Sequence, residues 1–238
     1  MMCFASFLSP AFEAFSNSDF IGMLIVMIQI GMSVVSWAAM LKKIMVLKTM
    51  NQRSAVFVDN FVREEDSLAL YYNRYAFGDT PMECVYVNTC ERFVSLIPAE
   101  QKARLARNEA VLAFPRKRME LVETTCAHAT NELSVQLNSG MTLLANVTNA
   151  APLLGLLGTV WGVMLAFFAM AESGSADIAE LAPGISSALL TTVVGLLVAI
   201  PSTIAYNILQ ARIDAATVQL EGFAEELMGK LSLQYQEA

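Results

Sequence analysis

The sequence predicts an all-α integral membrane protein with three transmembrane helices. Of its 238 residues, 55% are hydrophobic and 16% are charged, and the mean hydropathy is +0.50. These values are typical of membrane proteins. Thirteen of the fifteen lysines and arginines lie in residues 42–140, and the other two are Arg212 and Lys230. A net charge of −7 argues against nucleic-acid binding, which needs clustered cations.

One helical face continues without interruption from residue 183 to residue 227. Before Tyr206 this face is small or hydroxylated, as in a helix that packs in lipid. After Tyr206 it is mostly large and apolar, as in a helix that packs in water. We therefore expect a helix that crosses the bilayer over residues 185–209 and continues into water as the helical tail 210–238. The positions follow steps of three and four: Ala188, Thr192, Gly195, Ala199, Ser202, Tyr206, Leu209, Ile213, Ala216, Leu220, Phe223 and Leu227.

Two further runs are apolar and long enough to span a membrane. Residues 20–41 carry no charge, and Gln29 is the main polar interruption before Lys42 and Lys43 end the run. Residues 141–171 exceed the hydrocarbon thickness of about 30 Å, so one end should tilt or protrude. This second run has a predicted small-residue face: Pro152, Gly155, Thr159, Gly162 and Ala166.

The remaining segments connect or flank the spans. Residues 1–19 are predicted to form an amphipathic segment at the membrane surface, with a frayed terminus as the alternative. Residues 42–140 are expected to be helical, to extend the second span, and to pack against copies of themselves without a large separate core. Thr80 to Glu83 has the pattern of a helix-capping box. Residues 172–184 are expected to form a short acidic loop.

The distribution of basic residues predicts the orientation. Cytoplasmic segments of membrane proteins carry an excess of lysine and arginine. The loop 42–140 and the tail 210–238 should therefore face the cytoplasm, and the N-terminus and residues 172–184 the periplasm.

Hydroxyl groups are the remaining candidates for chemistry in the spans. His128 is the only histidine, and no nucleophile–base pair is present, so we expect neither an enzyme nor a metal site. Thr159 and Thr192, with Thr191 and Ser187 nearby, either bond to their own backbone and join helices or line a central passage. Hydroxyls do not ionise near neutral pH, so a titrating group for proton transfer would have to come from another subunit.

Glycines and prolines within the spans are candidates for helix packing or bending. Gly155, Gly162 and Gly195 lie on the small faces, where helices approach closely. Pro201 and the pair Pro183-Gly184 either punctuate the third helix or act as hinges.

Two runs carry a resemblance to a known family. GLLGTVWGVM (residues 155–164) and LAPGISSALLTTVVGLLVAIPSTIAYN (residues 181–207) resemble the TolQ/ExbB family of proton channels, with MotA as a more distant relative. Ser36-Trp37-Ala38 in the first span resembles the family more loosely. The chain departs from the family's PGIAEAL pattern, because Ser187 stands where these proteins usually have glutamate.

The resemblance implies a homopentameric ring in the bacterial inner membrane. It implies a single-span partner that resembles TolR or ExbD and carries a membrane aspartate, and a TolA-like or TonB-like protein that reaches the outer membrane. The proton is the implied coupling ion, with no other cofactor, and Thr159 and Thr192 fall on the family's pore threonines. The short N-terminus and Ser36-Trp37-Ala38 favour the TolQ role over the ExbB role.

Two other functions compete with that of a proton-driven motor subunit. The departure at Ser187 favours a non-conducting pentameric membrane scaffold for a single-span partner. A secondary transporter for a small solute is less consistent with the sequence, because three spans offer no inverted repeat.

Overall fold

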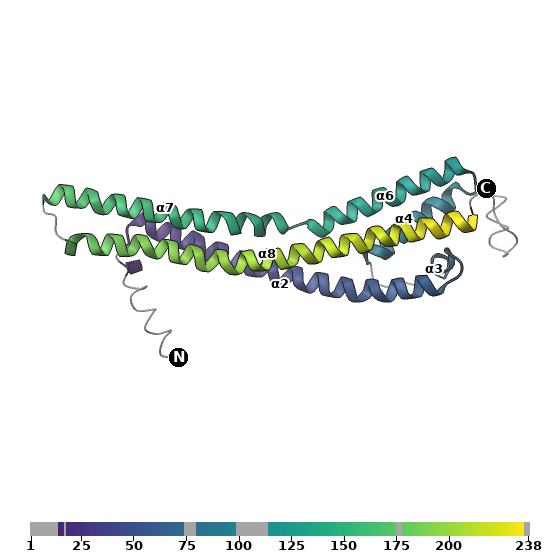
Figure 1. Ribbon diagram of the computed structural model, residues 1–238, viewed down its shortest axis with the longest axis horizontal. Coiled ribbons are helices and arrows are strands. Elements are labelled where there is room, and N and C mark those ends of the chain that lie inside the picture. Colours follow the sequence, from purple (N-terminus) through teal and green to yellow (C-terminus); the bar gives the residue numbers. More distant parts are fainter. Residues whose placement is uncertain (1–13, 17, 74–79, 99–113, 175–177, 236–238) are drawn as a thin grey trace. The chain divides into compact units, whose positions relative to one another are not determined.

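The computed structural model describes residues 14–16, 18–73, 80–98, 114–174 and 178–235 (Figure 1). Most of the predicted amphipathic segment 1–19 lies outside the described residues. Among the described residues, three helices are long and apolar enough to cross a membrane, which agrees with the predicted all-α membrane fold. The elements are α2 (Phe20–Arg63), α3 (Ala69–Tyr72), α4 (Pro81–Leu96), α6 (Arg116–Asn138), α7 (Met141–Ser173) and α8 (Ile178–Tyr235).

The chain divides into two compact units. The first, here called the membrane unit, comprises residues 1–43 and 140–209. The second, called the polar unit, comprises residues 44–139 and 210–238. Helices α2 and α8 each contribute residues to both units. The predicted continuous helix over residues 183–227 is therefore confirmed.

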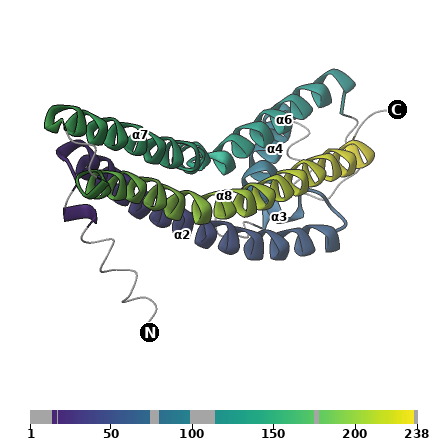
Figure 2. The ribbon, with the colours of Figure 1, turned by 60° about the vertical axis from the view of Figure 1, so that its left-hand side comes forward.

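In the membrane unit, the first part of α2, the helix α7 and the first part of α8 lie side by side (Figures 1 and 2). From Ala151 to Ala166 the buried positions of α7 are all alanine or glycine, and bulky side chains such as Phe168 and Leu197 are exposed. This is the arrangement expected of helices that pack in lipid. The buried positions of α7 in this unit are Met141, Leu144, Val147, Ala151, Gly155, Gly158, Gly162 and Ala166.

The buried face of α7 differs from the predicted one by part of a turn. Ala151 and Gly158 are buried where the prediction placed Pro152 and Thr159, and these two residues are half-buried at the edge. A helical face is wide enough to admit adjacent positions, so spacing alone does not choose between them. The buried positions are those that α8 approaches most closely, such as Gly158 beside Thr191.

The helix α8 begins at Ile178, seven residues before the predicted start of the third span. The loop predicted over residues 172–184 is therefore too long, because its second half is helical. Pro183 lies inside α8. The fixed φ of proline suits a helix, and a proline near the helix start removes a single hydrogen bond. Gly174, with φ of 65°, ends α7 in the left-handed conformation that favours glycine.

The second span was expected to continue into the helical region that precedes it, but it does not. Ser139 has extended backbone and Gly140 has φ of 80°, so α6 and α7 are separate helices. The first span does continue, because α2 runs through Lys42 and Lys43 to Arg63. The apolar run ends at these lysines but the helix does not, because lysine is a good helix former.

The polar unit has a large hydrophobic core of its own, contrary to expectation. Aromatic rings from distant segments meet there: the Phe57 and Phe61 rings each contact Tyr86 and Phe223 edge to face, with centroids 5.2–5.8 Å apart. Such pairs add stability beyond their buried area. These residues are widely spaced in sequence, so no local run indicates the core.

The core of the polar unit also contains two buried thiols. Cys90 on α4 and Cys126 on α6 are 0% and 2% exposed. Burial raises the pKa of both thiols, and it raises the pKa of the Tyr86 hydroxyl as well, because the charged form loses its hydration. The three groups are therefore neutral at physiological pH.

Helix ends in the polar unit are held by side chains. Thr80 Oγ1 accepts a hydrogen bond from the backbone N–H of Glu83 at 3.2 Å, which confirms Thr80 as the N-cap of α4. The Ser67 hydroxyl donates to Gln234 Oε1 at 2.6 Å, and the Tyr235 hydroxyl donates to Asp66 at 2.8 Å, near the end of α8. Distant segments are thus joined at this end of the unit.

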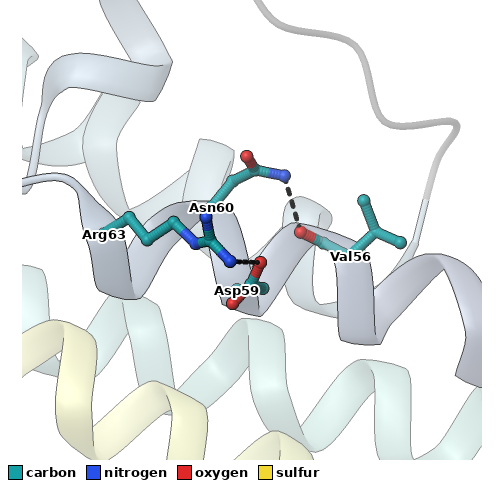
Figure 3. A network of polar contacts seen from close by, with 4 residues as sticks. All are labelled: Val56, Asp59, Asn60 and Arg63. Carbon is teal, nitrogen blue, oxygen red and sulfur yellow. Dashed lines mark hydrogen bonds and ion pairs between the residues drawn. The ribbon is translucent and has the colours of Figure 1, made fainter.

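The last turns of α2 present a polar face to solvent. Arg63 forms an ion pair with Asp59 at 2.9 Å, and Asn60 Nδ2 donates to the Val56 carbonyl at 2.7 Å (Figure 3). Both charged side chains are largely exposed, so the pair contributes little to stability. An exposed pair of charged side chains favours water over lipid around this part of α2.

Candidate functional site

Three threonine hydroxyls of the membrane unit meet near one backbone carbonyl, that of Gly155 on α7. Thr192 Oγ1 on α8 donates to the Gly155 oxygen at 2.9 Å, and Thr191 Oγ1 lies 3.1 Å from the same oxygen. Thr159 Oγ1 lies 3.5 Å from it and donates to the Leu156 carbonyl at 2.8 Å. The structure thus brings together three of the four predicted hydroxyl residues. They are called the threonine cluster below.

The members of the cluster differ in exposure. Thr191 is 1% exposed, whereas Thr159 and Thr192 are half-buried. The fourth predicted residue, Ser187, is also buried and donates to the Gly184 carbonyl at 3.0 Å, one turn earlier in α8. Two hydroxyls therefore lie at the edge of the packed helices, and two lie inside.

Glycines on α7 allow α8 to approach this closely. A Cβ atom at Gly158 would lie 2.3 Å from Thr191 Oγ1, and one at Gly162 would lie 2.7 Å from the Ala188 Cβ. Real Cβ atoms do not approach other atoms so closely. The predicted packing residue Gly162 is thus placed at the contact, together with Gly158, which the predicted face omits.

The other predicted packing residues lie along α8. A Cβ atom at Gly195 would lie 2.6 Å from the Ala151 oxygen, and one at Gly184 would lie 3.1 Å from the Ala166 Cβ. Both positions therefore sit at the α7–α8 contact. Pro183 and Pro201 lie within α8, and the helix continues through each of them.

Gln29 on α2 contacts the same place and is the residue that the sequence analysis missed. It is 0% exposed, and its Nε2 donates to the Ala151 oxygen at 3.3 Å and to the Thr191 oxygen at 3.1 Å. The sequence marks Gln29 only as a polar interruption of an apolar run. A polar residue inside a span is by itself a sign of a functional site, so the sequence alone could have marked Gln29 as a candidate.

Two more polar contacts join α2 to the other spans. Ser36 and Ser202 are buried, with their hydroxyl oxygens 2.8 Å apart, and Ser202 donates to the Val198 carbonyl. Asp19 accepts from the Trp161 indole N–H at 3.0 Å and from the backbone N–H of Gly22 at 3.2 Å. Asp19 thus caps the start of α2 and holds α7 beside it.

The threonine cluster and Gln29 offer neutral hydrogen-bonding groups and no titrating group. Hydroxyls, carbonyls and one carboxamide can bind water or a carboxylic acid, but they do not change charge near neutral pH. Among the residues that the structure describes, no group of three His, Cys, Asp or Glu side chains is placed to hold a metal ion. The arrangement suits passage or binding more than covalent chemistry.

Comparison with known proteins adds independent information. The model of the MotA/TolQ/ExbB proton channel family matches residues 99–222. The chain is 30% identical over 216 residues to the Tol-Pal system protein TolQ of Haemophilus influenzae, which covers 90% of each chain. It is 28% identical to TolQ of Pseudomonas aeruginosa over 91% of this chain and 90% of that protein. It is 40% identical to the biopolymer transport protein ExbB of Xanthomonas campestris pv. campestris over 46% of this chain and 44% of that protein.

Proposed function

The chain belongs to the MotA/TolQ/ExbB proton channel family, and from this premise we propose that it is the channel subunit of an inner-membrane motor. In this proposal it forms a homopentamer around single-span helices of a partner like TolR or ExbD. Protons that flow down the proton motive force move the two rings relative to each other. That motion energises a TolA-like or TonB-like protein that acts on the outer membrane.

The threonine cluster is the observation that carries the proposal. A cluster of hydroxyls inside three apolar helices is costly unless it serves packing or passage. Because none of these groups ionises near neutral pH, we assign the titrating group to the partner, as an aspartate in its membrane helix. The hydroxyls would then solvate that carboxylic acid during proton transfer.

Exposure separates the roles of the four hydroxyls. Thr159 and Thr192 are half-buried at the edge of the packed helices, so we assign to them contact with water or the partner. Thr191 and Ser187 are 1% and 6% exposed, so we assign to them the support of the pathway wall from inside. All four remain members of the proposed proton pathway.

A TolQ-like role is favoured over an ExbB-like role. The similarity to the TolQ proteins extends over about nine-tenths of both chains, whereas that to ExbB covers less than half. Ser36, part of the Ser-Trp-Ala run in the first span, is buried against Ser202.

By the positive-inside rule, the N-terminus and the α7–α8 connection would face the periplasm, and the C-terminus the cytoplasm.

Thr192→Val tests the proposal in cells, with Thr203→Val as the matched control. Valine keeps the shape of threonine and removes the hydroxyl. Thr203 lies on the same helix and donates to its own backbone at Ala199, 2.8 Å away, with no contact to Gly155. We expect Thr192→Val to abolish outer-membrane integrity in a strain that depends on this protein, while Thr203→Val sustains it. Both variants should copurify with the aspartate-bearing partner, and normal integrity with Thr192→Val would remove Thr192 from the mechanism.

A non-conducting scaffold is the second candidate, favoured by one observation. The hydroxyls of Thr159, Thr191 and Thr192 all donate to backbone carbonyls of the same chain, as purely structural threonines do. The scaffold would assemble with the same partner and would carry no protons. Partner-dependent proton flux across a reconstituted membrane excludes it.

A further inference from the structure

The Gln29 carboxamide lies where the three spans meet. Its Nε2 donates to one carbonyl on α7 and one on α8, those of Ala151 and Thr191. The two N–H groups are thus both used, and this fixes which end of the carboxamide is nitrogen and which is oxygen. Gln29 holds the first span against both others through backbone oxygens.

Two glycines make room for this side chain. A Cβ atom at Gly195 would lie 2.8 Å from Gln29 Nε2, and one at Gly155 would lie 3.4 Å from it. The same Cβ at Gly155 would lie 3.0 Å from both the Thr191 oxygen and the Thr192 Cα. The carboxamide therefore adjoins the threonine cluster directly.

The oxygen of the carboxamide is left without a donor. Within the part of the chain that the structure describes, no protein N–H or O–H group reaches Gln29 Oε1, although the atom is fully buried. The buried contact between Ser36 and Ser202 is different, because Ser202 donates to the Val198 carbonyl and accepts from the Ser36 hydroxyl. In the part of the membrane unit that the structure describes, Gln29 Oε1 is the only fully buried side-chain nitrogen or oxygen without a partner.

We propose that Gln29 Oε1 binds a water molecule, and that this water belongs to the polar pathway of the threonine cluster. Buried polar atoms are rarely left unsatisfied, and a water can donate two hydrogen bonds. Because Gln29 is 0% exposed, this water would occupy a site closed to bulk solvent, which opens by a small shift of the side chains around Oε1. One would go to Gln29 Oε1 and the other to a lone pair of a threonine hydroxyl, which each hydroxyl retains after donating its own proton. The role of the water in proton transfer rests on the proposed function, whereas its presence does not.

Water-edited solid-state NMR tests the site directly. The full chain, labelled with ¹⁵N in its glutamine side chains, is reconstituted in lipid bilayers with its aspartate-bearing partner. A soluble paramagnetic chelate broadens the signals of exposed glutamines and spares a buried one. We expect the Gln29 side chain, identified by the signal lost or shifted in Gln29→Leu or Gln29→Asn, to keep a strong cross-peak from water. A Gln29 signal without this cross-peak overturns the proposal.

Proton flux in proteoliposomes tests the role of the water. Gln29→Leu removes the carboxamide, and Ser36→Ala is the control, since it removes a polar contact from the same helix without touching the cluster. We expect Gln29→Leu to lower partner-dependent flux by about tenfold or more, because the pathway loses a water that relays protons, and Ser36→Ala to leave it near the wild-type value. Unchanged flux in Gln29→Leu overturns the role. Absence of flux in the wild type contradicts the proposed function instead, and the NMR result then still decides the water site.

Discussion

At the scale of single residues, the Gly155 carbonyl decides which threonine joins the two helices. A carbonyl oxygen has two lone pairs, and in an α-helix one accepts the N–H four residues on. Thr191 has a closer acceptor in the Ala188 carbonyl, at 2.7 Å. Thr192 is therefore the hydroxyl that depends on Gly155. Its bond joins α8 to α7, so a change at Thr192 affects both the pathway and its wall.

Gly195→Ala should weaken the packing of the membrane unit. The new Cβ would lie 2.6 Å from the Ala151 backbone oxygen and 2.8 Å from Gln29 Nε2, and backbone cannot yield without separating α7 from α8. We expect a loss of about 1–3 kcal/mol in the free energy of unfolding, as for other overpacked sites. Denaturant titration of the detergent-purified protein, followed by circular dichroism, measures it.

Gly31→Ala is the matched control for this substitution. Gly31 lies in the first span, and a Cβ atom there would meet nothing within 4 Å. Alanine should leave stability unchanged or raise it by about 0.5–1 kcal/mol, because it favours the helix. Equal losses from both variants would show that the close approach at Gly195 carries no special weight.

The hydroxyl residues of the site could be predicted from the sequence, but the residues that contact them could not. Thr159, Thr191 and Thr192 stand out because little else in the spans is polar. That Gln29 meets them depends on how three helices pack, and residues far apart in sequence give no local sign of this. The same holds for Gly158, whose burial is decided by the position of Thr191.

At the scale of elements, the α4 and α6 helices of the polar unit should make it sensitive to alkali. Burial raises the pKa of the Cys90 and Cys126 thiols above the ordinary value of 9.0, and that of Tyr86 above 10.0. A raised pKa in the folded state gives stability that is complete below the unfolded pKa and is lost as the pH rises towards the folded one. The free energy of unfolding should therefore be level near pH 7–8 and fall above about pH 9.

Cys90→Ser should reduce this loss, because serine does not titrate in the range. We expect the slope of stability against pH above pH 9 to become shallower by about 1.4 kcal/mol per pH unit. Urea unfolding between pH 7 and pH 11 measures the slope. Val85→Ala is the control, since it truncates a buried residue of the same helix and should lower stability equally at every pH. If Cys90→Ser keeps the wild-type slope, the thiol is not responsible.

Element boundaries were predictable where local chemistry sets them. The Thr80 cap of α4 has a sequence signature and is found in the structure. The start of α8 has no such signature, because Pro183 is compatible with either a loop or the first turns of a helix. Helix α2 passes Lys42 and Lys43 because the residues that end a membrane span need not end a helix.

At the scale of the whole molecule, membrane composition and the family could be predicted, and the core of the polar unit could not. Hydropathy marks the three spans, and the GTVWG and PGISSAL runs mark the family. The core forms from rings such as Phe57, Tyr86 and Phe223, which lie in three separate helices. No window of the sequence contains enough of them to indicate a core.

Proton flux across a reconstituted membrane tests the central claim most directly. The chain and its aspartate-bearing single-span partner are placed in proteoliposomes, a membrane potential is imposed, and the internal pH is followed with a fluorescent dye. The account predicts flux with both proteins present, and none when the partner is omitted or its aspartate is replaced by asparagine. A stable complex that carries no protons, or flux that persists without the partner's aspartate, would contradict it.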